Sequence, residues 1–339
     1  MTQTTPSENL RALPDPADAR ATTEAILFEV RRVIVGQDAM LERILVGLLA
    51  GGHLLLEGVP GLAKTLTIKT LADVLDASFR RIQFTPDLVP GDLVGTRIYR
   101  PDRGTFDTEL GPVFCNFLLA DEINRAPAKV QSALLEVMQE HQVTIAGTTY
   151  PVPQPFLVLA TENPIEAEGT YPLPEAQVDR FMMKVVVDYP RSTEEHAIVD
   201  RALRPAEPIR AMLTPEDLIQ MQGRVQEIYV DPAVVDYAVR LVAATRTPGI
   251  VGLGELERYV SYGASPRASI ALVIGGQALA YLRGRDYVLP HDLGDLALDV
   301  LRHRIVLSYE ALADAADADA IVTRLLGAVP APDVVLRSR

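Results

Sequence analysis

The sequence is poor in residues that build disulfide-linked or aromatic-rich folds: its 339 residues include one cysteine, no tryptophan and 6% aromatic residues. A single cysteine excludes an intrachain disulfide framework. Cys115 lies in an apolar run, where a thiol packs as a small hydrophobic group more often than it acts as a nucleophile. The lack of disulfides, and of an apolar signal-peptide segment in residues 1–18, predicts a cytoplasmic protein.

Basic residues are also scarce, because 32 Lys and Arg stand against 45 Asp and Glu, for a formal net charge of −13. Nucleic-acid-binding proteins usually present a basic face, so this balance disfavours a nucleic-acid partner, although it leaves a local basic patch open. The longest apolar stretch, residues 44–56, is too short for a membrane-spanning helix and contains Gly51-Gly52-His53. We therefore expect no transmembrane segment. The five histidines also lack the spacing of a zinc site.

Hydrophobic residues make up 48% of the chain and follow two patterns. Before Pro190, short apolar runs alternate with helical patterns, which is typical of a parallel sheet covered by helices on both faces. After Pro190 the pattern is helical and predicts no clear strand. The expected strands are 53–56, 81–84, 114–120, 156–160 and 184–187, the main expected helices before residue 190 are 19–33, 65–75 and 129–140, and those after it are 192–204, 215–228, 232–245, 266–283 and 291–303.

Two segments interrupt the alternation of strands and helices. Turn residues at 101–104 and 146–148 each separate two β-prone runs, so residues 96–109 and 142–152 are predicted to form hairpins. The chain is therefore predicted to consist of a flexible arm (1–18), an α/β domain (19–190) and a helical domain (191–339).

A glycine-rich segment joins the first predicted strand to a helix that begins near Lys64. In this context the backbone N–H groups of the segment curl around phosphates, and the helix N-terminus adds partial positive charge. Lys64 can reach the β- and γ-phosphates of a nucleotide, and Thr65 can place its hydroxyl on Mg²⁺. The predicted phosphate loop is Gly58-Val59-Pro60-Gly61-Leu62-Ala63-Lys64-Thr65.

Ala63 departs from the general form of this loop, which has glycine before the lysine. Alanine does not adopt a positive φ angle cheaply. We therefore expect Ala63 to take an ordinary right-handed helical conformation at the start of the helix.

Two further polar groups follow apolar strands. Asp121 and Glu122 end one strand, where Asp121 could support Mg²⁺ through its water shell and Glu122 could orient and deprotonate the attacking water. Asn163 ends the next apolar strand and could hold the same water, or could simply begin the Asn163-Pro164 turn.

Arginines are needed because the phosphoryl group spreads negative charge during transfer. Arg180 precedes the last predicted strand, and Arg267 follows Pro266 at the start of a helix in the second domain, from which it could reach back to the nucleotide. Arg125 is a weaker candidate. Taken alone, each of these arginines could also form an ordinary surface ion pair.

In this order, the segments 58–65, 118–127, 173–181 and 265–268 resemble those of an AAA+ ATPase of the MoxR family, and the resemblance covers roughly residues 20–305. It implies ATP and Mg²⁺ as cofactors, an AAA+ core and a helical lid. Ala63 agrees with the form of the loop usual in this family. The implied roles are Walker B for Asp121 and Glu122, sensor 1 for Asn163, the arginine finger for Arg180, sensor 2 for Arg267, and the adenine pocket for Val35, Gly36 and Gln37.

The resemblance also implies partners. Proteins of this kind typically form hexameric rings, in which Arg180 would act on the nucleotide of the neighbouring subunit. MoxR proteins are thought to act as chaperone-like remodellers of client proteins, and their partners often carry a von Willebrand factor A domain. ATP hydrolysis coupled to remodelling or maturation of a partner protein is therefore the expected function.

Other functions stay open at this point. A chelatase or nucleic-acid motor of the same superfamily is one alternative, against which the net charge of −13 argues in the case of DNA. A nucleotide-dependent scaffold with very slow hydrolysis is another, and Glu122 argues against it. A small-molecule kinase fits less well, because the predicted Glu122 suits the activation of water.

Overall fold

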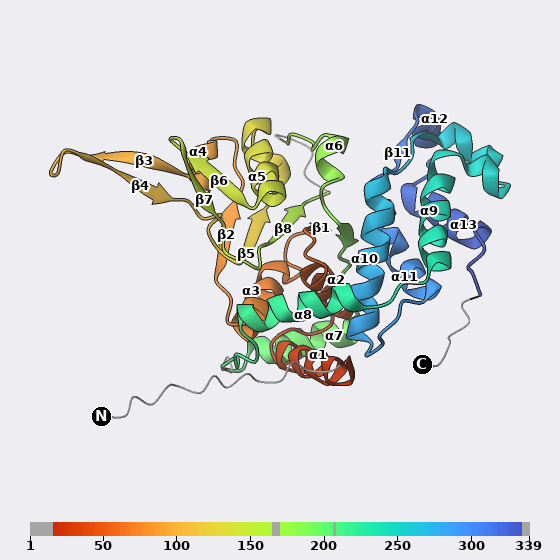
Figure 1. Cartoon of the computed structure of the whole chain (residues 1–339), viewed down its shortest axis with the longest axis horizontal. Coiled ribbons are helices and arrows are strands. Elements are labelled where there is room, and N and C mark those ends of the chain that lie inside the picture. Colours follow the sequence, from red (N-terminus) through yellow and green to blue (C-terminus); the bar gives the residue numbers. More distant parts are fainter. Residues whose placement is uncertain (1–15, 165–169, 206–207, 334–339) are drawn as a thin grey trace, which may run out of the picture.

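The computed structural model describes residues 16–164, 170–205 and 208–333 of the chain. Within these ranges, five strands form one parallel sheet in the order β2-β5-β8-β1-β9 (Figure 1). The predicted α/β fold with a parallel sheet is thereby confirmed. The strands are β1 (Leu54–Glu57), β2 (Phe79–Gln83), β5 (Phe117–Asp121), β8 (Leu157–Glu162) and β9 (Met183–Val186).

Because these strands are parallel, the sheet has a carboxyl end and an amino end. The carboxyl end comprises the residues that close or follow the strands, among them Gly58, Glu122 and Asn163. The amino end comprises the residues that precede β1 and β9, namely 50–53 and 179–182. Strands of four to six residues separate the two ends by about 13–20 Å at a rise of about 3.3 Å per residue.

Hydrophobic side chains cover both faces of the sheet. Successive side chains of a strand point to opposite faces. In β1, Leu54 and Leu56 join one hydrophobic cluster and Leu55 joins the other, and all three are fully buried. Helices α2 (Asp38–Leu49) and α3 (Lys64–Val74) contribute to the first cluster, and α5 (Ala128–Glu140) contributes to the second.

Both predicted hairpins are present and antiparallel. The first consists of β3 (Gly95–Arg100) and β4 (Thr105–Leu110) and projects from the α/β part of the molecule (Figure 1). The second consists of β6 (Gln142–Ile145) and β7 (Thr148–Pro151). The sequence did not predict the short helices α4 (Pro90–Val94) and α6 (Glu175–Val178), which are too short to show a helical repeat.

The part of the chain after Pro190 is mainly helical, as predicted. The expectation that no clear strand follows Pro190 is corrected in one place, where β10 (Val260–Tyr262) and β11 (Val306–Leu307) form a small antiparallel pair. Strands of three and two residues cannot show an alternating pattern, and their pairing depends on contacts between distant segments. The helices are α7 (Ser192–Ala202), α8 (Pro215–Glu227), α9 (Pro232–Arg246), α10 (Pro266–Leu282), α11 (Pro290–Leu301), α12 (Tyr309–Ala313) and α13 (Ala318–Ala328), with 3₁₀ turns at Pro248–Val251 and Gly254–Tyr259.

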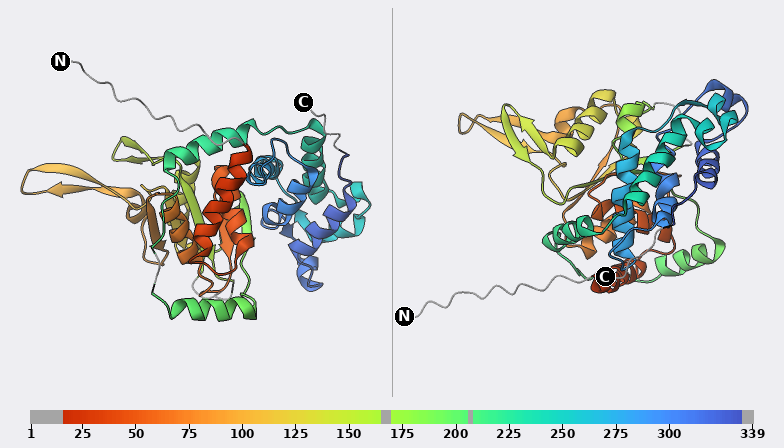
Figure 2. Two further views of the ribbon diagram at one scale, coloured as in Figure 1. Left: turned by 90° about the horizontal axis from the view of Figure 1, so that it is seen from below. Right: turned by 45° about the vertical axis from the view of Figure 1, so that its right-hand side comes forward.

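Helices α7 and α8 lie along the α/β part, whereas α9–α13 form a group beside it (Figure 2). The side chain of Arg201 in α7 donates a hydrogen bond to the carbonyl oxygen of Arg31 in α1 (Pro16–Arg31), and Gln222 in α8 donates one to that of Leu48 in α2. The proposed domain boundary at residue 190 stays a prediction. Residues 1–15 of the predicted arm lie outside the described ranges, and α1 begins at Pro16.

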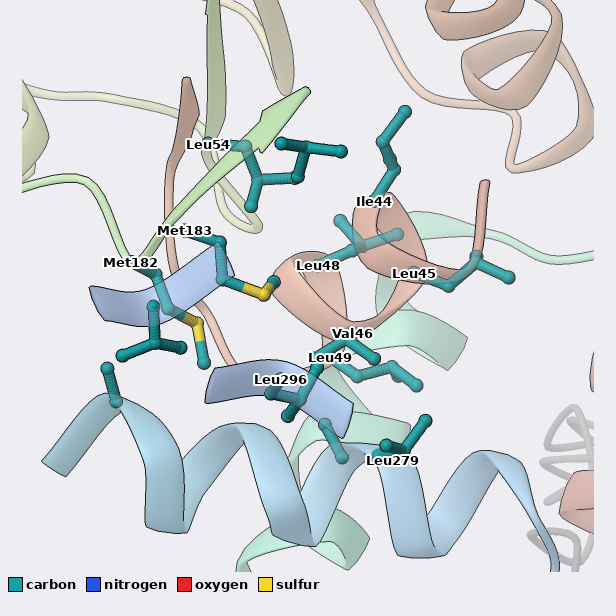
Figure 3. Packing of buried hydrophobic residues seen from close by; sticks show 14 of the residues in the cluster. Ile44, Leu45, Val46, Leu48, Leu49, Leu54, Met182, Met183, Leu279 and Leu296 are labelled. Atoms are coloured by element: carbon teal, nitrogen blue, oxygen red, sulfur yellow. The ribbon is translucent and has the colours of Figure 1, made fainter. Parts of the chain in front are cut away.

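The helical group and the sheet share one hydrophobic core. Leu279 of α10 and Leu296 of α11 pack toward α2 and Met182 (Figure 3). Gly275 in α10 permits this close approach, because a Cβ atom there would lie 2.9 Å from Leu296 and 3.0 Å from Met182. The helical group is therefore fixed against the amino end of the sheet. In the described part of the chain, no helix is long and apolar enough to cross a membrane.

Candidate nucleotide-binding site

The predicted phosphate loop connects the end of β1 to the start of α3 at the carboxyl end of the sheet. Only glycine fits at position 58, where a Cβ atom would lie 2.7 Å from the carbonyl oxygen of Val187. The Lys64 ammonium donates a hydrogen bond to the carbonyl oxygen of Gly58 at 2.6 Å, which closes the loop on itself. A loop in this position presents backbone N–H groups and a helix N-terminus to an anion.

Ala63 does not take the right-handed helical conformation that was expected from the sequence. Ala63 caps α3 with φ 56° and ψ 17°, which is a left-handed conformation. The chain has to turn from the loop into the helix at this residue, and the turn requires the positive φ angle whatever the side chain. For alanine this conformation costs about 1–2 kcal/mol, so the loop stores strain beside Lys64.

A pocket of about 720 Å³ adjoins the phosphate loop. Val35 and Gln37, two of the three predicted adenine-pocket residues, line it together with Ala63 and residues of α7. The third, Gly36, has a φ angle of +67°, and a Cβ atom there would lie 2.9 Å from the Glu194 carboxyl carbon in α7. This volume lies within the range of about 300–1,000 Å³ that is typical of pockets for small-molecule ligands. The structure thus places phosphate-binding and base-binding candidates on one cavity.

Asp121 is the last residue of β5, Glu122 follows it, and one hydroxyl group connects them. Thr161 Oγ1 donates a hydrogen bond to Asp121 Oδ1 at 2.6 Å and accepts one from the backbone N–H of Glu122 at 2.8 Å. Glu122 itself has a left-handed backbone with φ 57° and ψ 52°. Thr161 was not predicted as a site residue, although it stands in the polar run Thr161-Glu162-Asn163 after an apolar strand. Thr161 therefore orients the Asp121 carboxylate and fixes the backbone of Glu122.

Both carboxylates also have cationic or amide partners in this conformation. Arg81 Nη2 lies 2.5 Å from Asp121 Oδ2. Glu122 Oε2 accepts a hydrogen bond from Gln83 Nε2 at 2.8 Å and lies 2.9 Å from Arg125 Nε. The weaker arginine candidate, Arg125, is therefore held by Glu122. In this conformation Glu122 Oε2 is engaged by both Gln83 and Arg125.

Charged groups around the phosphate loop compensate one another. Burial lowers the pKa of Lys64, and the carboxylates of Asp121, Glu122 and Glu57 oppose this effect. Glu57 in turn lies 2.5 Å from the Lys184 ammonium. A cation at Lys64 with carboxylates close by suits a ligand that carries both phosphate and a divalent cation.

The oxygen donors at this end of the sheet fit Mg²⁺. The hydroxyl of Thr65 and the carboxylate of Asp121 are hard oxygen ligands of the kind that Mg²⁺ takes together with water and phosphate oxygens. Thr161 and Arg81 orient the Asp121 carboxylate. In the described ranges, no cluster of three or more His, Cys, Asp and Glu side chains could hold a metal ion by itself. An ion bound here would therefore depend on the nucleotide.

Asn163 follows β8, the strand between β5 and β1 in the sheet. Because of this strand order, Asn163 lies between Glu122, which follows β5, and the phosphate loop, which follows β1. Its side chain is buried. The position agrees with a residue that orients water, and that role stays a prediction.

Arg180 and Arg267 lie at the other end of the sheet. Both line a pocket of about 260 Å³, together with Asp179, Arg304 and residues 50–52. Asp179 and Arg180 precede β9, and Arg267 lies in the first turn of α10. The structure thus brings the two candidate arginines together, although 86 residues separate Asp179 from Ser265, which precedes α10.

This arginine pocket is remote from the phosphate loop. The two pockets share no lining residue. They lie at opposite ends of α2, because Gln37 precedes this helix and lines one pocket, whereas Ala50 follows it and lines the other. A helix of 12 residues is about 18 Å long. Within one subunit, Arg267 therefore does not reach back to the loop, contrary to the expectation from the sequence.

Comparisons with known proteins agree with these features. Residues 53–183 match the family described as ATPase family associated with various cellular activities (AAA), and residues 256–325 match the AAA lid domain. The chain is 56% identical over 313 residues to Chaperone MoxR1 of Mycobacterium tuberculosis, which covers 92% of this chain and 83% of that protein. It is 32% identical over 312 residues to Protein MoxR of Methylorubrum extorquens, which covers 87% and 90% respectively.

A solved structure extends this agreement to the fold. The crystal structure of a candidate ATPase from Cytophaga hutchinsonii superimposes with a TM-score of 0.89 at 48% identity, and the match covers 94% of this chain and 97% of that one. The match therefore extends over both the α/β part and the helical part of this chain. The chain therefore belongs to the MoxR family of AAA+ ATPases.

Proposed function

We propose that this chain is a Mg²⁺-dependent ATP hydrolase that works as a ring of identical subunits, hexameric in the form usual for such proteins. One observation carries the proposal. Arg180 and Arg267 lie at the amino end of the sheet, whereas the phosphate loop lies at the carboxyl end. A head-to-tail contact between subunits would bring one subunit's arginines to its neighbour's nucleotide, and repeated contacts of this kind close into a ring.

The residues then divide the chemistry between them. Lys64 and the backbone N–H groups of the loop bind the phosphates, and Glu122 orients the attacking water and accepts its proton, with Asn163 as the second contact to that water. When bound, Mg²⁺ would neutralise negative charge on the phosphate oxygens, held through Thr65 and Asp121. Exchange of the Arg125 and Gln83 contacts for water would accompany activation of Glu122.

The neighbour's arginines supply the remaining positive charge. Arg180 is the arginine finger in this proposal, and Arg267 acts beside it from the same subunit. In GTPases, an arginine supplied by a partner increases the rate by about 10³–10⁵.

The proposed work of the ring is chaperone-like remodelling or maturation of a partner protein. Similarity to a relative named Chaperone MoxR1 supports this role. The β3–β4 hairpin offers a contact surface, because the rings of Tyr99 and Phe106 lie 5.0 Å apart and are 51% and 56% exposed. The Arg97 guanidinium lies 5.1 Å from the Phe106 ring centre. A partner with a von Willebrand factor A domain fits the family resemblance.

The test separates binding of ATP from turnover. In Arg180→Ala, we expect kcat to fall about 10³-fold, while ATP affinity changes by less than about threefold, because the finger acts on the charge that develops in the transition state. The control Lys64→Ala removes a charged contact within the subunit's own site and should lose ATP binding. Specific activity should also rise with protein concentration as sites are completed. Wild-type turnover in Arg180→Ala would refute the proposal.

A further inference from the structure

Arg304 follows α11 at the boundary between the helical group and the sheet, and its side chain is 2% exposed. The guanidinium donates to five acceptors. Arg304 Nε donates to Asp179 Oδ1 at 2.7 Å, and the two Nη atoms donate to the carbonyl oxygens of Asp179, Phe181, Met182 and Val300 at 2.5–3.1 Å. A buried guanidinium that uses its donors in this way holds its neighbours in fixed positions.

Four of the five acceptors surround Arg180. They belong to residues 179, 181 and 182, so Arg304 fixes the backbone on both sides of the proposed finger. This segment leads directly into β9 of the central sheet. The direction in which Arg180 leaves the backbone therefore depends on Arg304.

Asp179 extends the same network to Arg267. Its Oδ1 binds Arg304, and its Oδ2 accepts a hydrogen bond from Ser265 Oγ at 2.9 Å. The Ser265 hydroxyl also caps α10 by accepting from the backbone N–H of Arg267 at 3.2 Å. One carboxylate thus bridges the segment that carries Arg180 and the helix start that carries Arg267.

The charges agree with this arrangement. Arg180, Arg267 and Arg304 line one pocket, in which Asp179 is the acidic lining residue. Burial lowers the pKa of Arg304, Asp179 opposes that effect, and the positive charge of Arg267 adds to it. Asp179 balances one of the three cations, which leaves the other two facing the pocket without a matching anion there.

We infer that Arg304 and Asp179 are positioning residues that hold Arg180 and Arg267 as one rigid pair, so that both arginines meet the neighbouring subunit's nucleotide together. This inference rests on the proposed function, in which these arginines act across the subunit contact. Arg304 touches no nucleotide in this account. It acts through the two arginines, and its loss should harm the neighbour's site and leave its own site intact.

The alternative is that Arg304 only anchors the lid to the sheet. Arg302 provides a matched control, because its side chain is 11% exposed and joins the lid to the core through the carbonyl oxygen of Lys184 at 3.3 Å, without touching residues 179–182. Arg304→Lys keeps the charge and cannot satisfy five acceptors. If this variant fails to fold, Asp179→Asn gives a second test, since it keeps the shape and removes the charge.

The experiment uses mixed assemblies of full-length chains with ATP and Mg²⁺. Arg304→Lys alone should lose about 10- to 100-fold in kcat with ATP affinity within about twofold, as small misplacements of catalytic groups do. Each variant is then mixed with an equal amount of Glu122→Gln, which lacks its own turnover and has intact arginines. Random head-to-tail mixing should restore Arg304→Lys to about half of the wild-type rate per Arg304→Lys subunit. Arg302→Lys should keep near-wild-type turnover without mixing.

The mixture of Arg180→Ala with Glu122→Gln is the reference. Recovery in both the Arg180→Ala and the Arg304→Lys mixtures supports the inference. Recovery with Arg180→Ala but not with Arg304→Lys or Asp179→Asn would overturn it and leave the proposed function standing. No recovery with Arg180→Ala would remove the proposed function, and the inference with it.

Discussion

The two ends of the central sheet use the same kind of ion pair in opposite settings. At the carboxyl end, Arg81 pairs with Asp121 while 49% of the arginine side chain is exposed. At the amino end, Arg304 pairs with Asp179 and is 2% exposed. An exposed pair can exchange partners when a ligand arrives, whereas a buried pair resists separation. The carboxyl end is thus suited to binding a ligand, and the amino end is suited to keeping side chains in fixed positions.

Backbone conformation shows the same division. Gln37, Ala63 and Glu122 lie around the nucleotide site, and each has a left-handed backbone without being glycine. Residues 179–182 include no positive φ angle and are held by hydrogen bonds from Arg304. Strain of this kind persists where the surrounding structure enforces it and often accompanies function.

The largest predicted difference between the two ends is in stability. Asp179→Ala would leave the buried Arg304 guanidinium without its carboxylate, and we expect the free energy of unfolding to fall by about 3–5 kcal/mol. Arg81→Ala removes an exposed partner and should cost less than about 1 kcal/mol. Denaturant unfolding of both variants measures the comparison. Equal losses would show that burial does not distinguish the two pairs.

A smaller effect is expected from pH. His53 precedes β1 at the amino end, is buried, and has its pKa lowered to about 4, first by burial and further by His141. Its Nδ1 accepts a hydrogen bond from the backbone N–H of Val158, so a proton there has no acceptor. The unfolded chain takes up a proton below pH 6.5 and the folded chain does not, so stability falls as pH drops from 6.5 to 4, by about 3 kcal/mol for this group.

The measurement is the free energy of unfolding at several pH values between 7 and 4. His53→Gln removes the titrating group and should flatten the curve relative to the wild type. His303, whose pKa burial also lowers, remains in both proteins and cancels in the difference. An identical pH slope in the variant would contradict the assignment.

The carboxyl end was largely predictable from sequence, because its parts are continuous segments. The phosphate loop occupies eight consecutive residues, and Asp121, Glu122 and Asn163 each directly close or follow an apolar strand. At the amino end, Arg180 and Arg267 lie in segments that carry the family resemblance, but the pairing of Asp179 with Arg304 was not predictable, because these two residues stand 125 residues apart and Arg304 lies outside those segments. Contacts that form only on folding leave little local signal in one sequence.

The error at Ala63 has the same origin. Sequence reasoning assigned the residue its cheapest conformation, whereas the geometry of the strand, loop and helix imposes a left-handed one. Local preference is a small term that the surrounding fold can override, and at this position the fold enforces a cost of about 1–2 kcal/mol.

The smallest predicted effect is a change in stability that measures the cost of the left-handed conformation at Ala63. Ala63→Gly relieves the left-handed strain and adds chain entropy to the unfolded state, so we expect a net gain of about 0.5–1 kcal/mol in the free energy of unfolding. Ala315 provides a matched control. It has a φ angle of 52°, belongs to the helical group and does not line the nucleotide pocket. Ala315→Gly should give a similar gain in stability and leave ATP affinity unchanged.

ATP affinity separates the two glycine variants. A glycine at 63 loosens the loop that presents Lys64, so Ala63→Gly should weaken ATP binding by a few-fold while the fold becomes more stable, because ordering the loop then costs more on binding. Calorimetric binding and denaturant unfolding on the same samples measure the two quantities. If both variants gain stability and neither loses affinity, the strain at Ala63 serves no binding purpose. The carboxyl end would then differ from the amino end in exposure alone.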